Sequence, residues 1–193
     1  MHKHVFLTGP PGIGKTTLIQ KVSEVLTSSG VPVDGFYTEE VRQGPRRVGF
    51  DVVTMSGNRG KLARISGSNE SSKYRVGQYA VDIASFEQLV IPLLDNLKSP
   101  RSSPRRPVCV IDEIGKMELF SQPFISGVKK VLDNSSVVVF GTLPVSRGRT
   151  LPVVEEVRHR QDVKLFTVTR ENREDILHEI VTSIQDCCTG KSK

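Results

Sequence analysis

The hydrophobic positions of the chain form two kinds of pattern. Residues 5–8, 108–111 and 137–140 are short runs of apolar and β-branched residues, as expected for strands that are buried on both faces of a sheet. Elsewhere, apolar residues recur every three or four positions, which is the spacing of an amphipathic helix. This spacing predicts helices over residues 15–28, 86–97, 124–132, 152–160 and 172–184.

The segment over residues 33–82 has a different pattern. Turn signals rich in glycine, proline and asparagine divide it into β-prone stretches at residues 33–41, 47–54, 61–65 and 74–81. The first two stretches predict a hairpin, and the whole segment predicts a run of antiparallel strands. Because the segment is short and no linker-like composition precedes it, we expect an addition to one domain over residues 1–193 rather than a second domain.

Strands and helices alternate over the rest of the chain, with a last predicted strand at residues 163–168. This alternation predicts an α/β fold with a mostly parallel central sheet and helices on both faces. Ligands of such sheets bind beyond the carboxyl ends of the strands. Gly9, Asp112 and Gly141 each stand at the end of a predicted strand, so we expect them to lie at that edge.

The composition is that of a globular protein. Hydrophobic residues make up 37% and charged residues 25% of the chain, which argues against a disordered protein. No apolar run approaches the roughly 18 residues that a membrane-spanning helix needs. The first residues already form a predicted strand, which leaves no room for a signal peptide. We therefore expect a cytoplasmic protein without membrane contact, and a monomer by default.

The formal net charge is +6, and two stretches carry much of the basic charge. One lies between Arg42 and Arg64, and the other contains Arg101, Arg105 and Arg106 in the proline-rich residues 99–107. Such charge is compatible with nucleic acid or with a small anionic substrate. The chain has no tryptophan and three tyrosines, so the stacking surfaces of single-strand binders are not evident. A nucleic-acid partner is therefore possible but not favoured.

The clearest motif follows the first predicted strand. It fits G-x-x-x-x-G-K-[ST] at every fixed position and consists of Gly9, Pro10, Pro11, Gly12, Ile13, Gly14, Lys15 and Thr16, followed by Thr17. A strand before it and a helix after it are the context that a phosphate-binding loop requires. Backbone N–H groups of the loop and of the helix N-terminus would hold phosphate oxygens. Lys15 would reach the β- and γ-phosphates, and the Thr16 hydroxyl would bind Mg²⁺.

A second motif stands at the end of the strand at residues 108–111. Asp112 is the expected partner of Thr16 in binding Mg²⁺, directly or through water. Glu113 follows at once, and a carboxylate in that place can orient or deprotonate an attacking water. This pair is more usual in phosphate-loop proteins that hydrolyse ATP than in small-molecule kinases. Lys116 is a candidate second cation on the γ-phosphate, and Thr38 and Glu39 are expected to border it.

Together, residues 9–16, the sequence Gly-Phe-Tyr-Thr-Glu-Glu at residues 35–40 and the sequence Asp-Glu-Ile-Gly-Lys-Met-Glu at residues 112–118 carry a family likeness. The chain resembles the thermostable nucleoside-triphosphate phosphatases, a family of P-loop NTPases. The resemblance implies Mg²⁺-dependent hydrolysis of ATP, GTP and other nucleoside triphosphates to the diphosphate and phosphate, with loose base choice. It also implies two nucleotide-binding segments, the phosphate loop and a strip made of Cys109, Val110, Ile111, Asp112, Glu113, Ile114, Gly115 and Lys116.

Phosphoryl transfer gains from an arginine placed on the developing charge. The sequence offers Arg147, Arg149, Arg158 and Arg160. We favour Arg158 or Arg160, because the helix before the last strand often lies over the phosphates in this architecture. The loop after the last strand, with Arg170 and Asn172, is expected to contact the base. An arginine plane there could stack on any base, which would suit weak base selectivity.

Two other functions remain open. A nucleotide or nucleoside kinase could use the basic residues between 42 and 64 to receive an anionic acceptor, and such an enzyme must exclude water. A nucleic-acid-associated switch could use the basic residues between 101 and 106, and its turnover or binding would respond to nucleic acid and salt. The Asp112–Glu113 pair and the family resemblance favour the triphosphatase over both.

Overall fold

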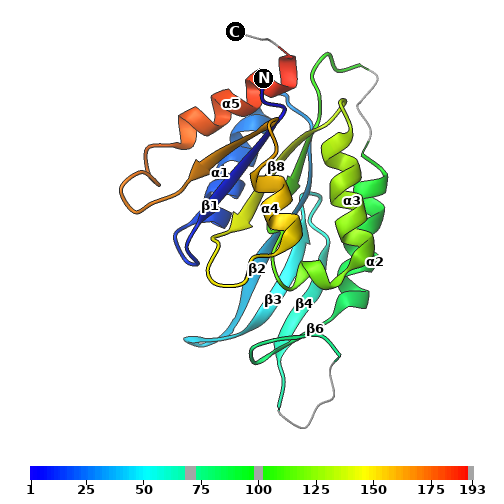
Figure 1. The fold of residues 1–193 in the computed structure, drawn as a ribbon. Coiled ribbons are helices and arrows are strands. Elements are labelled where there is room, and N and C mark those ends of the chain that lie inside the picture. The colour runs from blue at the N-terminus through cyan, green and yellow to red at the C-terminus, as the bar shows by residue number, and fades with distance from the viewer. Residues whose placement is uncertain (68–72, 98–101, 191–193) are drawn as a thin grey trace.

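The computed structural model describes residues 1–67, 73–97 and 102–190 (Figure 1). Its centre is a nine-stranded sheet with the order β5-β6-β4-β3-β2-β7-β8-β1-β9. The strands are β1 (His4–Gly9), β2 (Val33–Gln43), β3 (Arg46–Thr54), β4 (Arg59–Ile65), β5 (Arg75–Val76), β6 (Tyr79–Val81), β7 (Val108–Ile111), β8 (Val138–Pro144) and β9 (Val163–Thr167).

Helices cover both faces of the parallel part of this sheet (Figure 1). They are α1 (Lys15–Ser28), α2 (Ile83–Asp95), α3 (Gln122–Asp133), α4 (Pro152–Arg158) and α5 (Leu177–Thr189), with a short 3₁₀ turn, η1 (Glu118–Phe120). Helices α1 and α5 pack on one face, and α2, α3 and α4 pack on the other. None of the helices in the described part of the chain has the length and apolar character needed to cross a bilayer.

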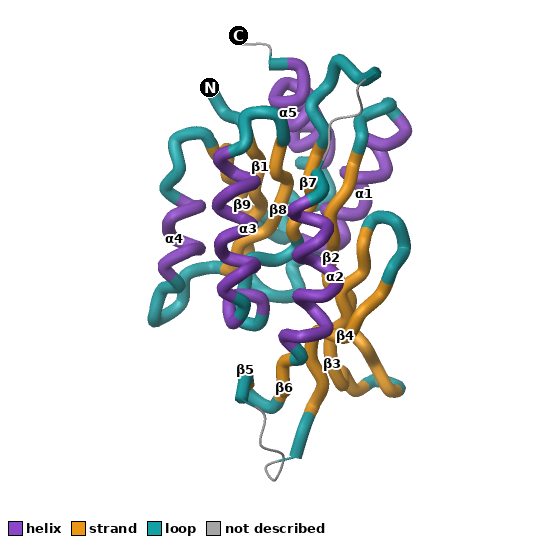
Figure 2. The backbone as a smooth tube through the Cα atoms, turned by 90° about the vertical axis from the view of Figure 1, so that its right-hand side faces the viewer, coloured by secondary structure: helices purple, strands orange, loops and turns teal. Residues whose placement is uncertain are grey.

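The sheet joins a parallel half to an antiparallel half. Strands β9, β1, β8, β7 and β2 pair in parallel, and β2, β3, β4, β6 and β5 pair antiparallel. The predicted α/β class is confirmed, and so is the antiparallel addition over residues 33–82. In Figure 2 the strands β3, β4 and β6 lie below the parallel strands, with α2 beside them.

Alternation along the buried strands explains why helices are needed on both faces. In β1, Val5 and Leu7 pack with α1 and α5, whereas Phe6 packs with the helices on the opposite face. All three side chains are fully buried. Cys109 in β7 is likewise fully buried, as its apolar neighbours predict. Each strand therefore presents apolar side chains to both layers, and the parallel half of the sheet is stable only between two layers of helices.

Several boundaries differ from the sequence prediction. Helix α2 begins earlier than predicted, because the Asp82 carboxylate accepts the Ser85 N–H as an N-cap. Helix α4 ends at Arg158, and α5 begins only at Leu177, after a series of turns. The predicted strand at residues 74–81 is divided into β5 and β6. The polar stretches 66–73 and 99–107 lie partly outside the described residues.

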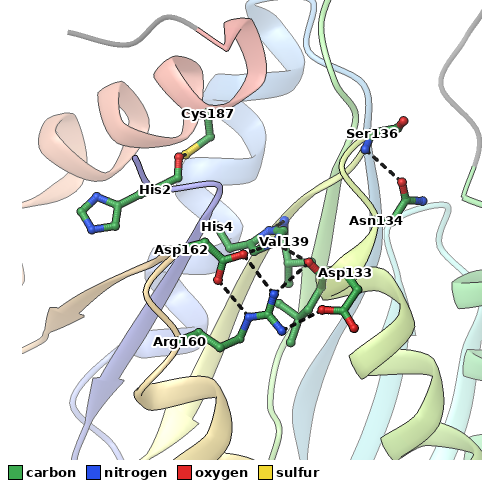
Figure 3. A network of polar contacts seen from close by, with 10 residues as sticks. His2, His4, Asp133, Asn134, Ser136, Val139, Arg160, Asp162 and Cys187 are labelled. Carbon is green, nitrogen blue, oxygen red and sulfur yellow. Dashed lines mark hydrogen bonds and ion pairs between the residues drawn. The ribbon is translucent and has the colours of Figure 1, made fainter.

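A buried polar network fixes the amino ends of β1 and β9 (Figure 3). His4 is fully buried, and its Nδ1 accepts the Val139 N–H at 3.0 Å. Its Nε2 must therefore carry the proton, and it donates to the Leu132 carbonyl at 2.9 Å. The neighbouring Arg160 donates to both carboxylate oxygens of Asp162 and to Leu132. Both hydrogen bonds of His4 require a neutral ring with one tautomer.

Acidification should therefore weaken the fold through His4. Burial lowers the pKa of His4 from 6.5, with partial compensation by the Leu132 carbonyl. Below that pH the unfolded chain binds a proton that the folded chain does not, so the free energy of unfolding falls as pH falls, by up to about 1.4 kcal/mol per pH unit. Urea unfolding of wild type and His4→Gln between pH 7.5 and 5.5 measures this slope. His178→Gln, at an exposed histidine, is the control. An unchanged slope in His4→Gln would contradict the assignment.

Candidate functional site

The phosphate loop connects β1 to α1 at the carboxyl edge of the sheet. Gly12 and Gly14 have φ angles of 78° and 111°, in the left-handed region that favours glycine. A Cβ at either position would meet nothing within 4 Å, so the backbone angle and not the lack of space requires glycine there. Gly14 is the N-cap of α1 and has no side chain that could accept the first N–H groups. Those donors point into the loop, where phosphate oxygens can accept from them.

Lys15 is the first residue of α1, directly after the loop. Its side chain is only 9% exposed, and its Nζ donates to the Gly9 carbonyl at 2.7 Å. The same nitrogen is 3.5 Å from Oε2 of Glu113. A buried ammonium group with one backbone acceptor and one carboxylate near it retains donor capacity for a phosphate oxygen. This places a positive charge between the loop and the end of β7.

Asp112 lies beside Thr16 at the end of β7. The carboxylate is 2% exposed, with Oδ2 accepting from Thr16 Oγ1 at 2.8 Å and Oδ1 accepting from Thr142 Oγ1 at 2.7 Å. Burial raises the pKa of Asp112, and the two threonine hydrogen bonds oppose that rise. Thr142, two residues before the end of β8, thus fixes one oxygen of Asp112 and leaves the other facing Thr16.

The Thr16 and Asp112 oxygens are a donor set that suits Mg²⁺. Magnesium prefers oxygen ligands, and in nucleotide sites it takes one or two from the protein and the rest from phosphate and water. Within the described residues, no three histidine, cysteine, aspartate or glutamate side chains gather as a metal site. The residues therefore fit a magnesium ion that arrives with a nucleotide, rather than one held by a protein cage.

Glu113 and Glu118 are neighbouring carboxyl groups, and Glu113 is the one that contacts Lys15. Burial raises the pKa of Glu113, an effect that Lys15 opposes and Asp112 reinforces. Glu118 is 5% exposed, and burial together with Glu113 raises its pKa to about 8. A Cβ on Gly115 would lie 2.5 Å from Glu113 Oε1 and 3.1 Å from Glu118 Oε2. Glycine at 115 therefore leaves the space that both carboxyl groups occupy.

These groups open onto one pocket of about 800 Å³. It runs from the phosphate loop past Asp112 and Glu113 to the strands β2, β3 and β4. Of the predicted site residues, it is lined by Gly9, Pro11, Gly12, Gly14, Lys15, Thr16, Thr17, Asp112, Glu113 and Lys116, and also by Thr38 and Glu39. The pocket thus brings together predicted residues from three separate stretches of the chain.

Other predicted residues lie behind this surface. Cys109, Val110 and Ile111 are fully buried strand residues, and Ile114 is fully buried as well. Pro10, Ile13 and Gly115 do not line the pocket either. Their contribution is to position the loop and the end of β7. The chemical groups of the predicted strip are therefore Asp112, Glu113 and Lys116.

The preferred arginine prediction is wrong for Arg160. Its guanidinium lies with His4 and Asp162 at the amino ends of the strands (Figure 3). Strand β1 runs from His4 to Gly9, so the phosphate loop lies at the opposite edge of the sheet. The reason is chain direction. Helix α4 runs back toward the amino edge, so the residues that join it to β9 must lie there.

Arg158, the other preferred arginine, contacts the end of β8 but does not line the pocket. It donates to the Pro144 carbonyl at 2.8 Å and lies 3.5 Å from Glu155, without lining the pocket. This hydrogen bond ties α4 to the end of β8, where the loop between β8 and α4 begins. That loop carries Arg147 and Arg149, and both of these line the pocket. Of the four arginines that the sequence offered, these two line the pocket.

The loop after β9 also differs from expectation. The Asn172 side chain accepts the Thr169 N–H and donates to the Thr167 carbonyl, so its amide stabilises its own turn. Neither Asn172 nor Arg170 lines the pocket. Arg173 from the same loop donates to the Ile13 carbonyl at 3.4 Å, which places the loop against the phosphate loop. Base contact by Arg170 stays a prediction.

Three site residues were missed from the sequence. Thr142 lies two residues after the apolar run at 137–140. A hydroxyl group just after a predicted strand was its only signal. Glu118 stands in the quoted 112–118 stretch but had no assigned role. The third, Arg47, lines the far end of the pocket from β3. Its place follows from the register of β2 and β3, which the sequence alone did not provide.

Comparison with known proteins gives consistent matches. The family model NTPase_1, described as NTPase, matches residues 4–181. The chain is 61% identical to the human protein named cancer-related nucleoside-triphosphatase, over 96% of this chain and 98% of that protein. It is 38% identical to nucleoside-triphosphatase THEP1 of Thermotoga maritima, over 94% and 95% of the two chains.

Two solved structures have the same fold. The solution structure of the human cancer-related nucleoside triphosphatase superposes with a TM-score of 0.84, at 61% identity, covering 95% of this chain and 98% of that one. The crystal structure of THEP1 from Aquifex aeolicus superposes with a TM-score of 0.78, at 36% identity, covering 94% and 99%.

Proposed function

The chain belongs to the nucleoside-triphosphatase family that its motifs resemble, and we propose that it hydrolyses nucleoside 5′-triphosphates to the diphosphate and phosphate in a magnesium-dependent reaction with little base selectivity. One observation carries the proposal. The Glu113 carboxylate lies 3.5 Å from Lys15 Nζ, directly beside the Asp112–Thr16 pair. A base, a cation and a metal-binding pair therefore converge on the place where a γ-phosphate would lie.

The phosphate loop supplies binding. Its N–H groups and the N-terminus of α1 hold the α- and β-phosphates, as in other loops of this sequence. Lys15 exchanges its hydrogen bond to the Gly9 carbonyl for one to a β- or γ-phosphate oxygen. Because Lys15 is nearly buried, its charge acts on the phosphate with little screening by water.

Thr16 and Asp112 would hold magnesium. The ion, when bound, neutralises charge on the β- and γ-phosphate oxygens. Thr142 holds Asp112 in place through its 2.7 Å hydrogen bond, which leaves Oδ2 on the side of Thr16. These two threonines therefore orient the carboxylate before any ligand arrives.

Glu113 acts on the attacking water. Burial raises the pKa of Glu113, and the Lys15 ammonium opposes that rise and so favours the carboxylate form, which accepts a proton. The water oxygen forms a bond to the γ-phosphorus, and the bond from that phosphorus to the β–γ bridging oxygen breaks. The nucleoside diphosphate leaves with the electron pair, and the water proton passes to Glu113. Lys116 lies on the same side of the pocket and adds positive charge.

Weak base selectivity is supported by the loop after β9. The Asn172 amide is engaged within its own turn, so it is not available to read a base edge. Arg170 offers a planar cation, and stacking on such a plane depends little on which base is present.

Phosphate release from ATP, GTP, CTP and UTP tests the proposal. We expect release from all four when magnesium is supplied and loss of release when EDTA removes it. Release from one triphosphate alone would contradict the broad base choice. Equal release in EDTA would contradict the magnesium dependence.

Arg147 and Arg149 should contribute to turnover. We expect Arg147→Ala/Arg149→Ala to lower kcat by about 100-fold, with a smaller change in KM, because a cation on the transferring phosphoryl group acts mainly in the transition state. Steady-state kinetics measures this effect, and the single variants show which side chain carries it.

Arg160→Ala is the matched control for the arginine prediction. It should lower the thermal midpoint, because Arg160 pairs with Asp162 and Asp133, and it should leave kcat unchanged. Wild-type kcat in the double variant would contradict a catalytic role for the β8–α4 loop.

A further inference from the structure

The proposed hydrolysis leaves one buried acidic side chain of the pocket without a role. Glu118 is 5% exposed, and it lines the pocket together with Glu113, Lys116 and Met117. A carboxyl group that is almost completely buried is costly in free energy unless it is neutral or paired with a cation. Its place in the pocket, beside the proposed base, points to a part in the reaction.

A short turn fixes the position of Glu118, which is the first residue of η1. The Leu119 N–H donates to the Gly115 carbonyl at 3.0 Å, and the Ser121 N–H donates to the Glu118 carbonyl at 3.0 Å. Ser121 is also the N-cap of α3. The turn therefore folds Glu118 back toward Gly115 and Glu113, and α3 holds it there.

The two carboxylate oxygens of Glu113 face different neighbours. Oε2 lies 3.5 Å from Lys15 Nζ. Oε1 lies on the side of Glu118, because a Cβ on Gly115 would be 2.5 Å from Glu113 Oε1 and 3.1 Å from Glu118 Oε2. A direct hydrogen bond or a single bridging water can span two oxygens that lie so close to one point. Since an ionised carboxylate only accepts, one of the two carboxyl groups must carry a proton for this bond to form.

Glu118 is the carboxyl group that is placed to carry this proton. Within the described residues no lysine, arginine or histidine pairs with it, whereas Glu113 has the Lys15 ammonium beside it. Burial and the charge of Glu113 raise the pKa of Glu118 to about 8. The N–H groups of Glu118 and Gly115 oppose this rise, and the charge of Asp112 reinforces it. Two nearby carboxyl groups in different surroundings can divide in this way, with one neutral and one ionised.

The helices packed against η1 bring no cation to Glu118. These helices are α2 and α3. On α2, the half-buried Glu87 accepts from Ser121 Oγ at 2.8 Å and does not line the pocket. On α3, the charged residues lie in the second half of the helix, where Lys129 pairs with Glu156 of α4. The surroundings of Glu118 therefore favour its neutral form.

We propose that Glu118 is a positioning residue for the hydrolysis, and that its acid form donates to Oε1 of Glu113, directly or through one water, and so fixes the Glu113 carboxylate beside the attacking water. The inference rests on the proposed function. Glu118 keeps its own proton, while the proton of the attacking water passes to Glu113. Asp112 is held in a similar way, since Thr142 donates to one of its oxygens and leaves the other facing Thr16.

Glutamine and leucine at position 118 separate this role from a structural one. Glu118→Gln keeps the shape and a neutral donor, so kcat should stay within about threefold of wild type. Glu118→Leu removes the donor and should lower kcat by about 10- to 100-fold, the effect of losing a hydrogen bond to a charged group, with a much smaller change in KM. Steady-state phosphate release measures both constants. A loss in Glu118→Gln as large as in Glu118→Leu would overturn the role of a neutral donor.

Combination with Glu113→Gln tests whether Glu118 acts through Glu113. Effects of two residues that act through one another are not additive. In the Glu113→Gln background, Glu118→Leu should therefore lower kcat by less than about threefold. An equal fold loss in the two backgrounds would overturn positioning through Glu113.

Glu87→Leu is the matched control at the same turn. It removes the acceptor of the Ser121 hydroxyl without touching the pocket. The thermal midpoint should fall, and kcat should stay that of wild type. A fall in kcat as large as that of Glu118→Leu would show that kcat follows the stability of the turn, which would overturn the proposal.

Infrared spectroscopy locates the proton without relying on turnover. In neutral heavy water, the C=O band of a neutral carboxyl group lies apart from the bands of carboxylates. Wild type should show this band, Glu118→Gln should lose it, and Glu156→Gln, at an exposed carboxylate, should keep it. A band that persists in Glu118→Gln would place the proton elsewhere and overturn the proposal. This measurement needs no leucine variant, so it decides even if Glu118→Leu does not fold.

The two proposals fail in distinguishable ways. Wild-type kcat in a folded Glu118→Leu would overturn the positioning role and leave the triphosphatase intact. Absence of phosphate release from the wild-type protein would overturn the proposed function, whatever the infrared band shows.

Discussion

Glu113→Gln should bind nucleoside triphosphates as wild type does and lose kcat by about 10²- to 10⁴-fold, the range that a general base contributes. Glutamine keeps the shape of the side chain but cannot accept the proton of the attacking water. The carboxylate of Glu113 is also the neighbour of Lys15, at 3.5 Å, so its loss frees that ammonium for phosphate. Affinity for the nucleotide should therefore be kept or slightly raised. Stopped-flow binding and single-turnover phosphate release separate the two effects.

The matched control for Glu113→Gln is Glu156→Gln. Glu156 is an exposed carboxylate on α4 that pairs with Lys129 and does not line the pocket. Its variant should keep wild-type turnover. If Glu113→Gln retained most of its kcat, the base would have to be another group, and the Asp112–Glu113 assignment would be wrong.

Lys15→Ala should lose nucleotide binding by about 100-fold or more, because each hydrogen bond from a charged donor to a phosphate oxygen contributes on the order of 1.5–3 kcal/mol. The substitution has a second effect. It removes the positive charge that opposes the rise of the Asp112 and Glu113 pKa values. Both carboxyl groups should then protonate more readily, which weakens magnesium binding as well. Titration with a fluorescent ATP analogue measures the affinity, with and without magnesium.

Lys21→Ala is the control for Lys15→Ala. Lys21 lies on the same helix, α1, and is exposed. It should bind nucleotide normally, and both variants should retain the folded spectrum. Wild-type affinity in Lys15→Ala would show that the loop does not hold the phosphates through this side chain.

The phosphate loop and the Asp112–Glu113 pair were predictable because each is contiguous in sequence. A glycine-rich stretch between an apolar strand and an amphipathic helix has few possible conformations, and a carboxylate at the end of a buried strand must lie at the sheet edge. The same is true of the two-layer packing, since runs such as 108–111 are apolar at every position. These features depend on neighbours within a few residues, and those are visible in the sequence.

The arginines were less predictable because their places depend on the path of the chain between elements. Arg160 lies two residues beyond α4, yet this small offset takes it to the amino edge of the sheet, where it pairs with Asp162. Arg147 lies on the loop that reaches the pocket. No local pattern distinguishes the two positions. The direction of α4 relative to β8 and β9 decides between them.

The basic stretch between 42 and 64 was misleading for a related reason. Its acidic partners come from neighbouring strands: Asp51 on β3 pairs with Arg59 and Arg64 of β4, and Glu40 on β2 pairs with Arg47 on β3. A count along the chain gives an excess of positive charge. Cross-strand ion pairs with Glu39, Glu40 and Asp51 offset part of this charge, and Arg47 is the basic residue of the stretch that lines the pocket. The role of Thr142 could not be predicted from the sequence for the same reason, because its contact with Asp112 depends on the pairing of β7 with β8.

Turnover in ¹⁸O-labelled water tests the central claim most directly. The protein is supplied with magnesium and each of the four common ribonucleoside triphosphates, and the released phosphate and diphosphate are examined by mass spectrometry. Attack of a Glu113-oriented water on the γ-phosphorus places one labelled oxygen in every released phosphate and none in the diphosphate. The same pattern should hold for all four triphosphates and should be lost in Glu113→Gln. Label in the diphosphate, or no labelled phosphate from any triphosphate, would contradict hydrolysis at the γ-phosphate by this site.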